Sequence, residues 1–188
     1  FLEGVLQSIP RVQLTVSDQP PPSVPQNTIL VFDQHTPDSI PPGNVMVIDP
    51  NRTCDLWNLG ALIEHPLVAT QANDSPLMTH VQLENVIMNE ARQLEILAEH
   101  QTLAASLQDE PLYASIDRPG GKVLVLTANL QRGDLPLRTA FPIMMTNAIT
   151  WFRGPQGEFR EALSTGSIVE LDLQREPEPT TAAGAPAE

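Results

Sequence analysis

The stretch 120–154 constrains the fold more than any other part of the chain. Its first part, residues 122–127 (KVLVLT), is apolar and rich in β-branched side chains, which is typical of a strand buried on both faces. Asp134 then offers a side chain that can cap a helix, and Pro136 presets the backbone of a first helical turn. A buried strand that leads into a helix predicts an α/β fold.

The predicted helix has one apolar face, because large apolar side chains recur every third or fourth residue. These side chains are Leu137, Phe141, Met144, Ala148 and Trp151. Pro142 lies inside this pattern and predicts a kink or a later helix start. Gly154 and Pro155 end the helix. We interpret the apolar face as core rather than as a cofactor site.

The N-terminal third predicts two buried parallel strands, residues 28–32 and 44–48, after a short helix at residues 1–9. Residues 11–17 alternate between apolar and polar side chains, as a half-buried strand does. A helix that covers a parallel sheet normally follows a strand, so we expect the first strand of the sheet to lie upstream of this chain.

The remainder predicts further strands that extend the sheet in antiparallel fashion. We expect a short helix or loop at residues 54–63 and a helical turn at 93–100, and strands at 67–71, 85–91, 102–107, 112–116 and 167–173. The sequence Arg118-Pro119-Gly120-Gly121 predicts a tight turn. We therefore expect one α/β domain over residues 1–175 and a disordered Pro/Ala/Glu-rich tail at 176–188.

The charge of the chain excludes some partners. With 23 acidic and 10 basic residues, the formal net charge is −13 and the isoelectric point is near 4.5. Nucleic acid is a polyanion, so we expect no nucleic-acid binding. No apolar run is long enough to cross a bilayer, so we expect no membrane insertion by this segment. The acidity indicates solubility or a basic partner.

Polar side chains follow several predicted buried strands. Asp33 and His35 follow the first strand, Asp49 follows the second, and Asn129 follows the strand at 122–127. Ligands of open α/β sheets bind beyond the carboxyl ends of the strands. These four residues are therefore our candidate ligand crevice, and the alternative is that they are ordinary turn residues.

Other chemistry has little support in the sequence. Cys54, the single cysteine, has no flanking glycine, and the adjacent carboxylate of Asp55 would raise the pKa of its thiol. The four histidines show no metal-binding spacing, and no phosphate-binding glycine loop or nucleophile elbow is present. We predict no catalytic cysteine, no metal and no cofactor.

Three segments carry a family resemblance. FDQHTPDSIPPGNVMVIDP, DSPLMTHV and PLYASIDRPGGKVLVLTANLQRGDLPLRTAFPIMMTNAITWF resemble the class I glutamine amidotransferase-like domain of large membrane-anchored proteins. Those proteins are related to the aerotolerance protein BatA and carry a von Willebrand factor A domain. The residues that fit the most specific motif are Asp134, Pro136, Leu137, Arg138, Phe141, Pro142, Asn147 and Trp151. The resemblance implies a three-layer, flavodoxin-like mixed sheet with helices on both faces.

The resemblance does not extend to the catalytic residues of active amidotransferases. Those enzymes carry a cysteine in a glycine-flanked turn and a late histidine, whereas no histidine follows His100 here. A fold without its site does not carry the activity. Two hypotheses remain: a non-catalytic interaction or structural module, or a hydrolase or sugar-related enzyme that uses Asp33, His35 and Asp49.

The resemblance also implies a setting for the chain. The expected partners are other domains of the same parent chain or envelope proteins. The parent would be membrane-anchored and this domain soluble, with an extracytoplasmic location as one alternative. The oligomeric state is left open.

Overall fold

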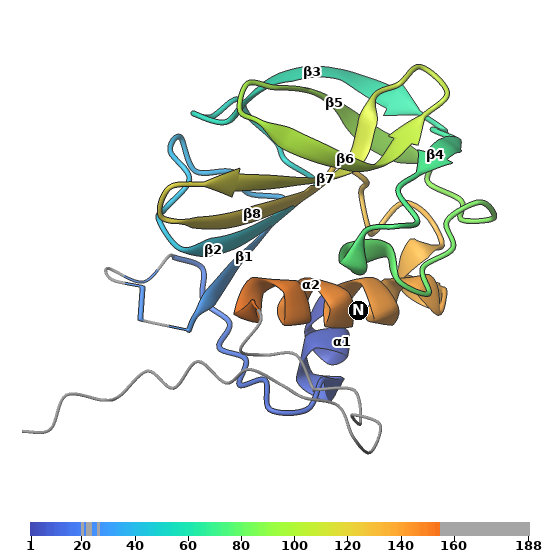
Figure 1. The fold of residues 1–188 in the computed structure, drawn as a ribbon. Helices are drawn as coiled ribbons and strands as arrows, with labels where there is room; N and C mark the ends of the chain where they lie inside the picture. Colours follow the sequence, from blue (N-terminus) through green and yellow to red (C-terminus); the bar gives the residue numbers. More distant parts are fainter. Residues whose placement is uncertain (20, 22–23, 26, 155–188) are drawn as a thin grey trace, which may run out of the picture. The chain divides into compact units, whose positions relative to one another are not determined.

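The chain forms an α/β structure built on a mixed sheet. The computed structural model describes residues 1–19, 21, 24–25 and 27–154, all within one compact unit, Phe1–Glu158. A six-stranded sheet has the order β1-β2-β8-β7-β6-β4, and β3 pairs with β5 in a second, two-stranded sheet (Figure 1). The predicted strand at 167–173 and the predicted tail at 176–188 lie outside the described residues.

The elements are α1 (Leu2–Ser8), β1 (Ile29–Asp33), β2 (Asn44–Ile48), β3 (Trp57–Glu64), β4 (Val68–Gln71), the 3-10 helix η1 (Pro76–Met78), β5 (Glu90–Ile96), β6 (His100–Ser106), β7 (Pro111–Arg118), β8 (Gly121–Leu126), the 3-10 helix η2 (Leu135–Leu137) and α2 (Ala140–Arg153).

The six-stranded sheet is parallel on one side and antiparallel on the other. β1, β2 and β8 run parallel, whereas β8–β7, β7–β6 and β6–β4 are antiparallel pairs. The turn at Arg118–Gly121 connects β7 to β8, as predicted from Pro119 and Gly120. The expected antiparallel extension of the sheet is therefore confirmed.

The central strands β2 and β8 are buried on both faces, as the apolar run predicted. Side chains alternate along a strand, so successive residues enter different cores. Met46, Ile48, Leu124 and Leu126 belong to a core shared with α2, and Val45, Val47, Val123 and Val125 belong to a second core. Two cores on opposite faces fix the register of both strands, because a one-residue slip would exchange them.

Both helices cover the same face of the six-stranded sheet (Figure 1). Leu6 of α1 is buried, and its neighbours Leu2 and Val5 pack against the core that contains Phe141 and Met144 of α2. The predicted N-terminal helix is therefore confirmed. Its apolar face packs against the core that α2 and the sheet form together.

The opposite face is covered by the sheet of β3 and β5, which corrects the expectation of helices on both faces. Trp57 of β3 is fully buried and Leu94 of β5 is 3% exposed. Both belong to the second core, with Val47 and Val125 beneath them. A short β-sheet therefore does the packing that a helix does in a doubly wound fold.

The helix α2 begins later than the apolar pattern suggested. It starts at Ala140, which places Pro142 in the first turn, where a missing N–H is tolerated. Leu137 lies in η2 and is 69% exposed, so its predicted place in the core was wrong. Asp134 makes no side-chain cap; its Oδ1 accepts the N–H of Ile87 at 2.7 Å.

Four further predictions were wrong. Residues 85–91, expected to form a strand, lie mostly before β5, which begins at Glu90. Residues 11–17 form no strand, residues 54–63 lie mostly in β3, and residues 93–100 lie mostly in β5 and at the start of β6. Trp151 packs against the core of the six-stranded sheet, as its place in the apolar pattern predicted, but it is only half-buried. Its ring lies beside that of Phe152, and its centroid is 4.4 Å from Lys122 Nζ.

Candidate functional site at the strand ends

The parallel arrangement brings together the carboxyl ends of three strands. β1 ends at Asp33, Asp49 follows β2 directly, and Asn129 comes three residues after β8. β2 lies between β1 and β8. Because the strands are parallel, these residues meet at one edge of the sheet, where ligands of open α/β sheets bind.

Asp49 is at the centre of this edge. It is 9% exposed, and its Oδ2 accepts two hydrogen bonds, from Asn129 Nδ2 at 2.7 Å and from Gln34 Nε2 at 3.1 Å. The two amides come from the ends of the strands on either side. The carboxylate therefore ties β1 to β8 across the end of β2.

The backbone at these positions is held in an uncommon conformation. Gln34 and Asp49 have φ values of 54° and 48°, in the left-handed region that disfavours side chains other than glycine, asparagine and aspartate. Each is fixed by a backbone hydrogen bond, Gln34 N–H to Ile48 O at 2.9 Å and Asp49 N–H to Leu126 O at 2.8 Å. The hydrogen bonds to the sheet therefore hold both residues in this strained conformation.

The carboxyl groups at this edge titrate away from their ordinary range. Burial raises the pKa of Asp49, and the hydrogen bond from Gln34 and the charge of Arg92 oppose that rise. The pKa of Asp33 is also raised, by burial first and then by the negative charge of Asp49. The two carboxyls therefore interact electrostatically, although Asp33 is solvent-exposed as a residue.

The strand β5 adds Glu90 and Arg92, and the loop after β8 adds Arg132, three residues that sequence reasoning missed. Asn129 N–H donates to Glu90 O at 3.0 Å, and Arg92 N–H donates to Thr127 O at 3.1 Å. Arg132 Nη1 pairs with Glu90 Oε1 at 2.5 Å. A charged trio from β5 and the loop after β8 therefore borders the strand ends.

The guanidinium of Arg92 is the cation that acts on Asp49. Its Nε is buried and has no hydrogen-bond partner among the described residues. The only sequence signal for Glu90 and Arg92 is that they alternate with Ala91 and Gln93, a pattern that is visible once the segment is known to be a strand.

His35 does not join the other candidates. It is exposed, and its ring lies 6.1 Å from the ring of Phe32, centroid to centroid. No hydrogen bond or ion pair between described residues links it to Asp33 or Asp49. Of the four candidates, the structure thus brings three together and leaves His35 apart.

Cys54 lies in the second core, away from the strand ends. It is 8% exposed, and its Sγ accepts the N–H of Leu56 at 3.4 Å. Burial raises the pKa of the thiol, and the charge of Asp55 adds to this. The carboxylate of Asp55 is itself occupied, since it accepts Ile40 N–H at 2.9 Å. A protonated, packed thiol has the character of a core side chain.

Two concavities lie elsewhere on the molecule. A groove of about 590 Å³ lies between β5 and the β6–β7 hairpin, and a hollow of about 190 Å³ lies near the start of α2. Neither is lined by Asp33, His35, Asp49 or Asn129. Among the described residues, no group of three or more metal-ligating side chains is placed to hold a metal, and no helix is long and apolar enough to cross a membrane.

Comparisons with known proteins identify a distant structural neighbour and no sequence relative. The sequence matches no protein-family model and no curated protein. Among solved structures, a cytoplasmic protein from Salmonella typhimurium aligns with a TM-score of 0.46 and 9% sequence identity, covering 58% of this chain and 55% of that one. The chain therefore spans about half the length of that protein.

Proposed function

We propose that this chain is a non-catalytic interaction module of a larger protein. The observation that carries the proposal is the burial and hydrogen bonding of the Asp49 carboxylate. Its carboxylate is 9% exposed and accepts the amides of Gln34 and Asn129 on one oxygen. A carboxylate engaged in bracing three strand ends is poorly placed to act on a substrate, because a general base must reach the proton that it removes.

Cys54 supports the same proposal. Its sulfur is packed in the second core and holds a backbone N–H, and its pKa is raised. Thiol catalysis needs the opposite conditions, a lowered pKa or a base within hydrogen-bonding distance.

The finer family assignment is part of the proposal. We infer a flavodoxin-like, class I glutamine amidotransferase-like domain whose parent is membrane-anchored and carries a von Willebrand factor A domain. The parallel strands β1, β2 and β8, with α2 after β8, support the flavodoxin-like part of this inference. The nature of the parent is inferred from the sequence resemblance alone. The partners would then be other domains of the parent chain or envelope proteins.

The decisive experiment measures catalysis by the purified chain. Ammonia release from glutamine would be compared between the wild type and Cys54→Ala, with far-UV circular dichroism as the control for folding. We expect equal, negligible release from both proteins. Turnover that Cys54→Ala abolishes would overturn the proposal.

A second candidate is a hydrolase or sugar-related enzyme that works at the strand ends. The raised pKa values of Asp33 and Asp49 favour it, because an interacting pair of carboxyls can serve as acid and base. The matching experiment assays disaccharide and ester hydrolysis by the wild type and by Asp33→Asn. Turnover that falls at least about a hundredfold in this variant would establish the enzyme instead of the module.

A further inference from the structure

One edge of β5 is only partly paired. On one side β5 pairs with β3, and Leu97 N–H donates to Leu56 O at 2.9 Å just beyond the pairing of Trp57 with Ile96. Backbone groups point alternately to the two sides of a strand. Since Leu97 faces β3, Ile96 and Leu94 direct their N–H and C=O groups to the other side.

The N-terminal end of β5 confirms this alternation. Arg92 N–H bonds to Thr127 O on the side away from β3, and Arg92 is two residues before Leu94. Beyond Arg92, no described strand pairs with that side of β5. The edge is therefore paired at Glu90–Arg92 and open at residues 93–96.

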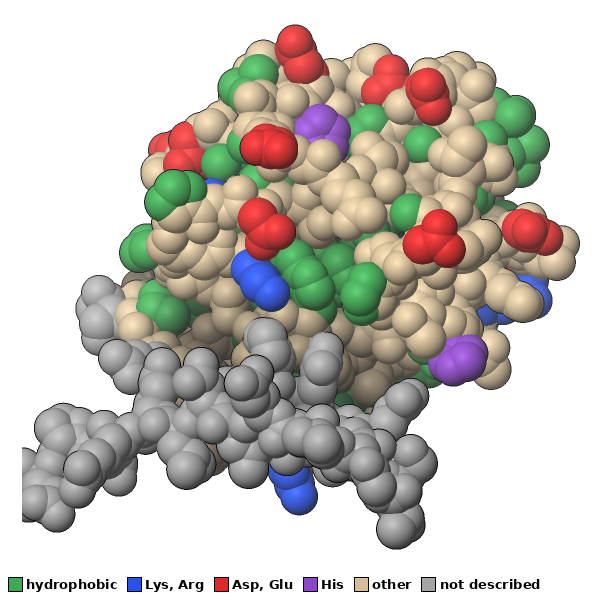
Figure 2. Space-filling view, viewed as in Figure 1, with side chains coloured by type: hydrophobic (Ala, Val, Ile, Leu, Met, Phe, Trp, Pro, Cys, Tyr) green, Lys and Arg blue, Asp and Glu red, His purple; other side chains and the backbone are tan. Residues whose placement is uncertain are grey.

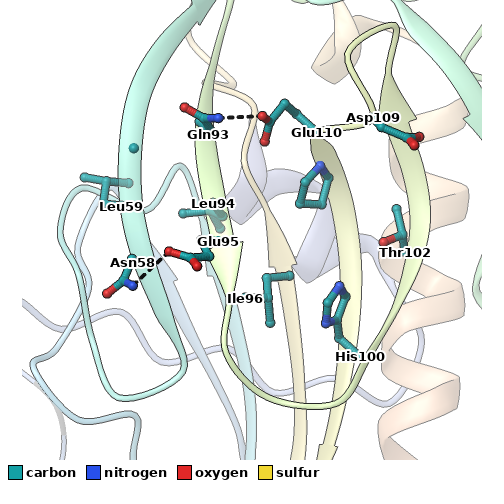
Figure 3. Close-up of a pocket in the computed structure, with 12 residues that line it drawn as sticks. Asn58, Leu59, Gln93, Leu94, Glu95, Ile96, His100, Thr102, Asp109 and Glu110 are labelled. Carbon is teal, nitrogen blue, oxygen red and sulfur yellow. Dashed lines mark hydrogen bonds between the residues drawn. The ribbon is translucent and has the colours of Figure 1, made fainter.

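The open edge borders a groove. The groove has a volume of about 590 Å³, within the range of about 300–1,000 Å³ that ligand sites occupy. β3 and β5 form one wall and the β6–β7 hairpin forms the other (Figure 3). Gly60 contributes no side chain to the wall, and a Cβ there would come within 2.8 Å of Gln93 Oε1. The unpaired edge of β5 therefore borders this groove.

The groove has a single sign of charge. Its lining carries Glu95, Asp109 and Glu110, and neither lysine nor arginine. Glu95 and Asp109 are exposed and Glu110 is half-buried. The acidic side chains visible on the face shown in Figure 2 agree with the net charge of −13. A cationic ligand is the complement of such a surface.

The acidic side chains are also held in position. Gln93 Nε2 donates to Glu110 Oε1 at 2.5 Å across the groove, and Asn58 Nδ2 donates to Glu95 Oε2 at 3.0 Å (Figure 3). Leu94 is buried and Ile96 half-buried between them. Along the open edge Glu95 lies between Leu94 and Ile96, and Asp109 and Glu110 lie on the facing hairpin. This arrangement suits a segment in which basic and apolar residues alternate.

We propose that this groove binds an extended, lysine- or arginine-containing protein segment, which pairs with the open edge of β5 and places its basic side chains against Glu95, Asp109 and Glu110. The inference rests on the proposed function, since it names the surface and the partner chemistry of the module. Strand addition supplies affinity through main-chain hydrogen bonds, and the carboxylates supply the preference for basic side chains.

The test uses the full chain and fluorescein-labelled octapeptides in which lysine and valine alternate. Fluorescence anisotropy measures the dissociation constant. The comparison ligands are a glutamate–valine octapeptide, a lysine–valine octapeptide with alternate N-methyl groups on the backbone, and spermine as an unlabelled competitor. We expect the N-methylated peptide to bind at least about tenfold more weakly and the glutamate peptide not at all, because one loses strand pairing and the other is repelled.

A matched pair of triple variants tests the location. Glu95→Gln, Asp109→Asn and Glu110→Gln remove three charges, and the amide oxygens can still accept the bonds from Asn58 and Gln93. Glu3→Gln, Asp74→Asn and Asp117→Asn remove three exposed charges outside the groove. We expect the groove variant to weaken binding at least about tenfold and the control variant to change it less than about twofold.

Amide hydrogen exchange distinguishes pairing from general attraction. On peptide binding, the amides of Leu94 and Ile96 should gain protection, whereas that of Glu95, which faces β3, should change little. Equal binding of the N-methylated peptide, displacement by spermine at the same charge concentration, or an unaffected groove variant would each overturn the inference. Those outcomes would not bear on the ammonia-release assay, which tests the proposed function separately.

Discussion

Two aspartates with opposite pKa shifts show how single residues tune this fold. The pKa of Asp33 is raised by burial and by Asp49, whereas that of Asp134 is lowered by its hydrogen bond to Arg138. A raised carboxyl pKa means that the folded state binds the proton more tightly than the unfolded chain does. Stability from such a group declines as pH rises, and a lowered pKa gives the reverse.

Asp33→Asn should raise the melting temperature at neutral pH. The substitution removes the cost of burying the charge and the repulsion from Asp49. That cost arises as pH rises from the ordinary carboxyl value of 3.8 through the raised folded value. Since Asp33 is exposed, solvent screening reduces the gain to about 1–3 °C. Thermal melts at pH 7 and pH 3.5 measure it, and the gain should shrink at pH 3.5. Asp38→Asn, at an exposed site paired with Arg52, is the control.

Asp134→Asn should have the opposite effect. The carboxylate accepts Ile87 N–H and the guanidinium of Arg138, so it joins the loop before β5 to η2. Its contribution is present above pH 3.8 and lost as pH falls through the lowered folded value. The variant should melt below the wild type at pH 7, and the gap should close in acid. A gap of constant size would show that packing, not charge, is the cause.

At the scale of elements, the sequence predicted the strands that a local apolar pattern marks. It missed the strands that form only because a distant segment pairs with them. β2 and β8 are continuous apolar runs, and their burial on both faces follows from that pattern alone. β5 reads EARQLEI, which consists of good helix formers apart from its last residue. Pairing with β3, some thirty residues earlier, overrides that preference. Residues 11–17 alternate between apolar and polar side chains, but no strand in the described part of the chain pairs with them.

The β7–β8 turn illustrates an element fixed by close backbone approach. Gly43 N–H donates to Gly120 O at 2.7 Å, and Arg118 donates to the carbonyl oxygens of Ile40 and Pro41. Gly121 has φ 144°, and a Cβ there would lie 2.1 Å from Gly43 O. The turn and the β1–β2 connection are therefore packed backbone against backbone.

Gly121→Ala should destabilise the protein by more than about 2 kcal/mol, because backbone strain of about 1–2 kcal/mol adds to a clash that only a shift of the β1–β2 connection can relieve. Gly120→Ala is the matched control, since φ there is also positive, 98°, but no atom lies within 4 Å of the added Cβ. Urea unfolding of both variants measures the difference. Equal losses would mean that strain alone, and not the contact with Gly43, determines the cost.

At the scale of the whole molecule, the candidate site combines predictable and unpredictable parts. Asp33, Asp49 and Asn129 could be named because each follows an apolar strand. Their meeting depends on the order β1-β2-β8, which no local pattern encodes. Arg92 and Glu90 reach the same edge only because β5 crosses back to bond with Thr127 and Asn129. His35, placed by the same reasoning as Asp33, turns instead toward Phe32.

The hydrogen bonds between β5 and the residues after β8, Thr127 and Asn129, also join the two sheets. The second core contains Trp57 and Leu94 from the small sheet and Val47 and Val125 from the large one. A two-stranded sheet is marginal on its own, so β3 and β5 depend on this core. We therefore expect the two sheets to unfold together rather than in sequence.

Trp57 makes this testable, because it is fully buried and the chain has two tryptophans. In a Trp151→Phe background, fluorescence reports on Trp57 alone, while far-UV circular dichroism reports on the whole molecule. Urea midpoints from the two probes should coincide, as two-state unfolding requires. Val47→Ala and Met144→Ala, each expected to cost about 1–5 kcal/mol, weaken the opposite cores and should shift both probes together. A fluorescence transition at lower urea would instead show that the small sheet detaches first, which would leave the groove beside β5 without its wall.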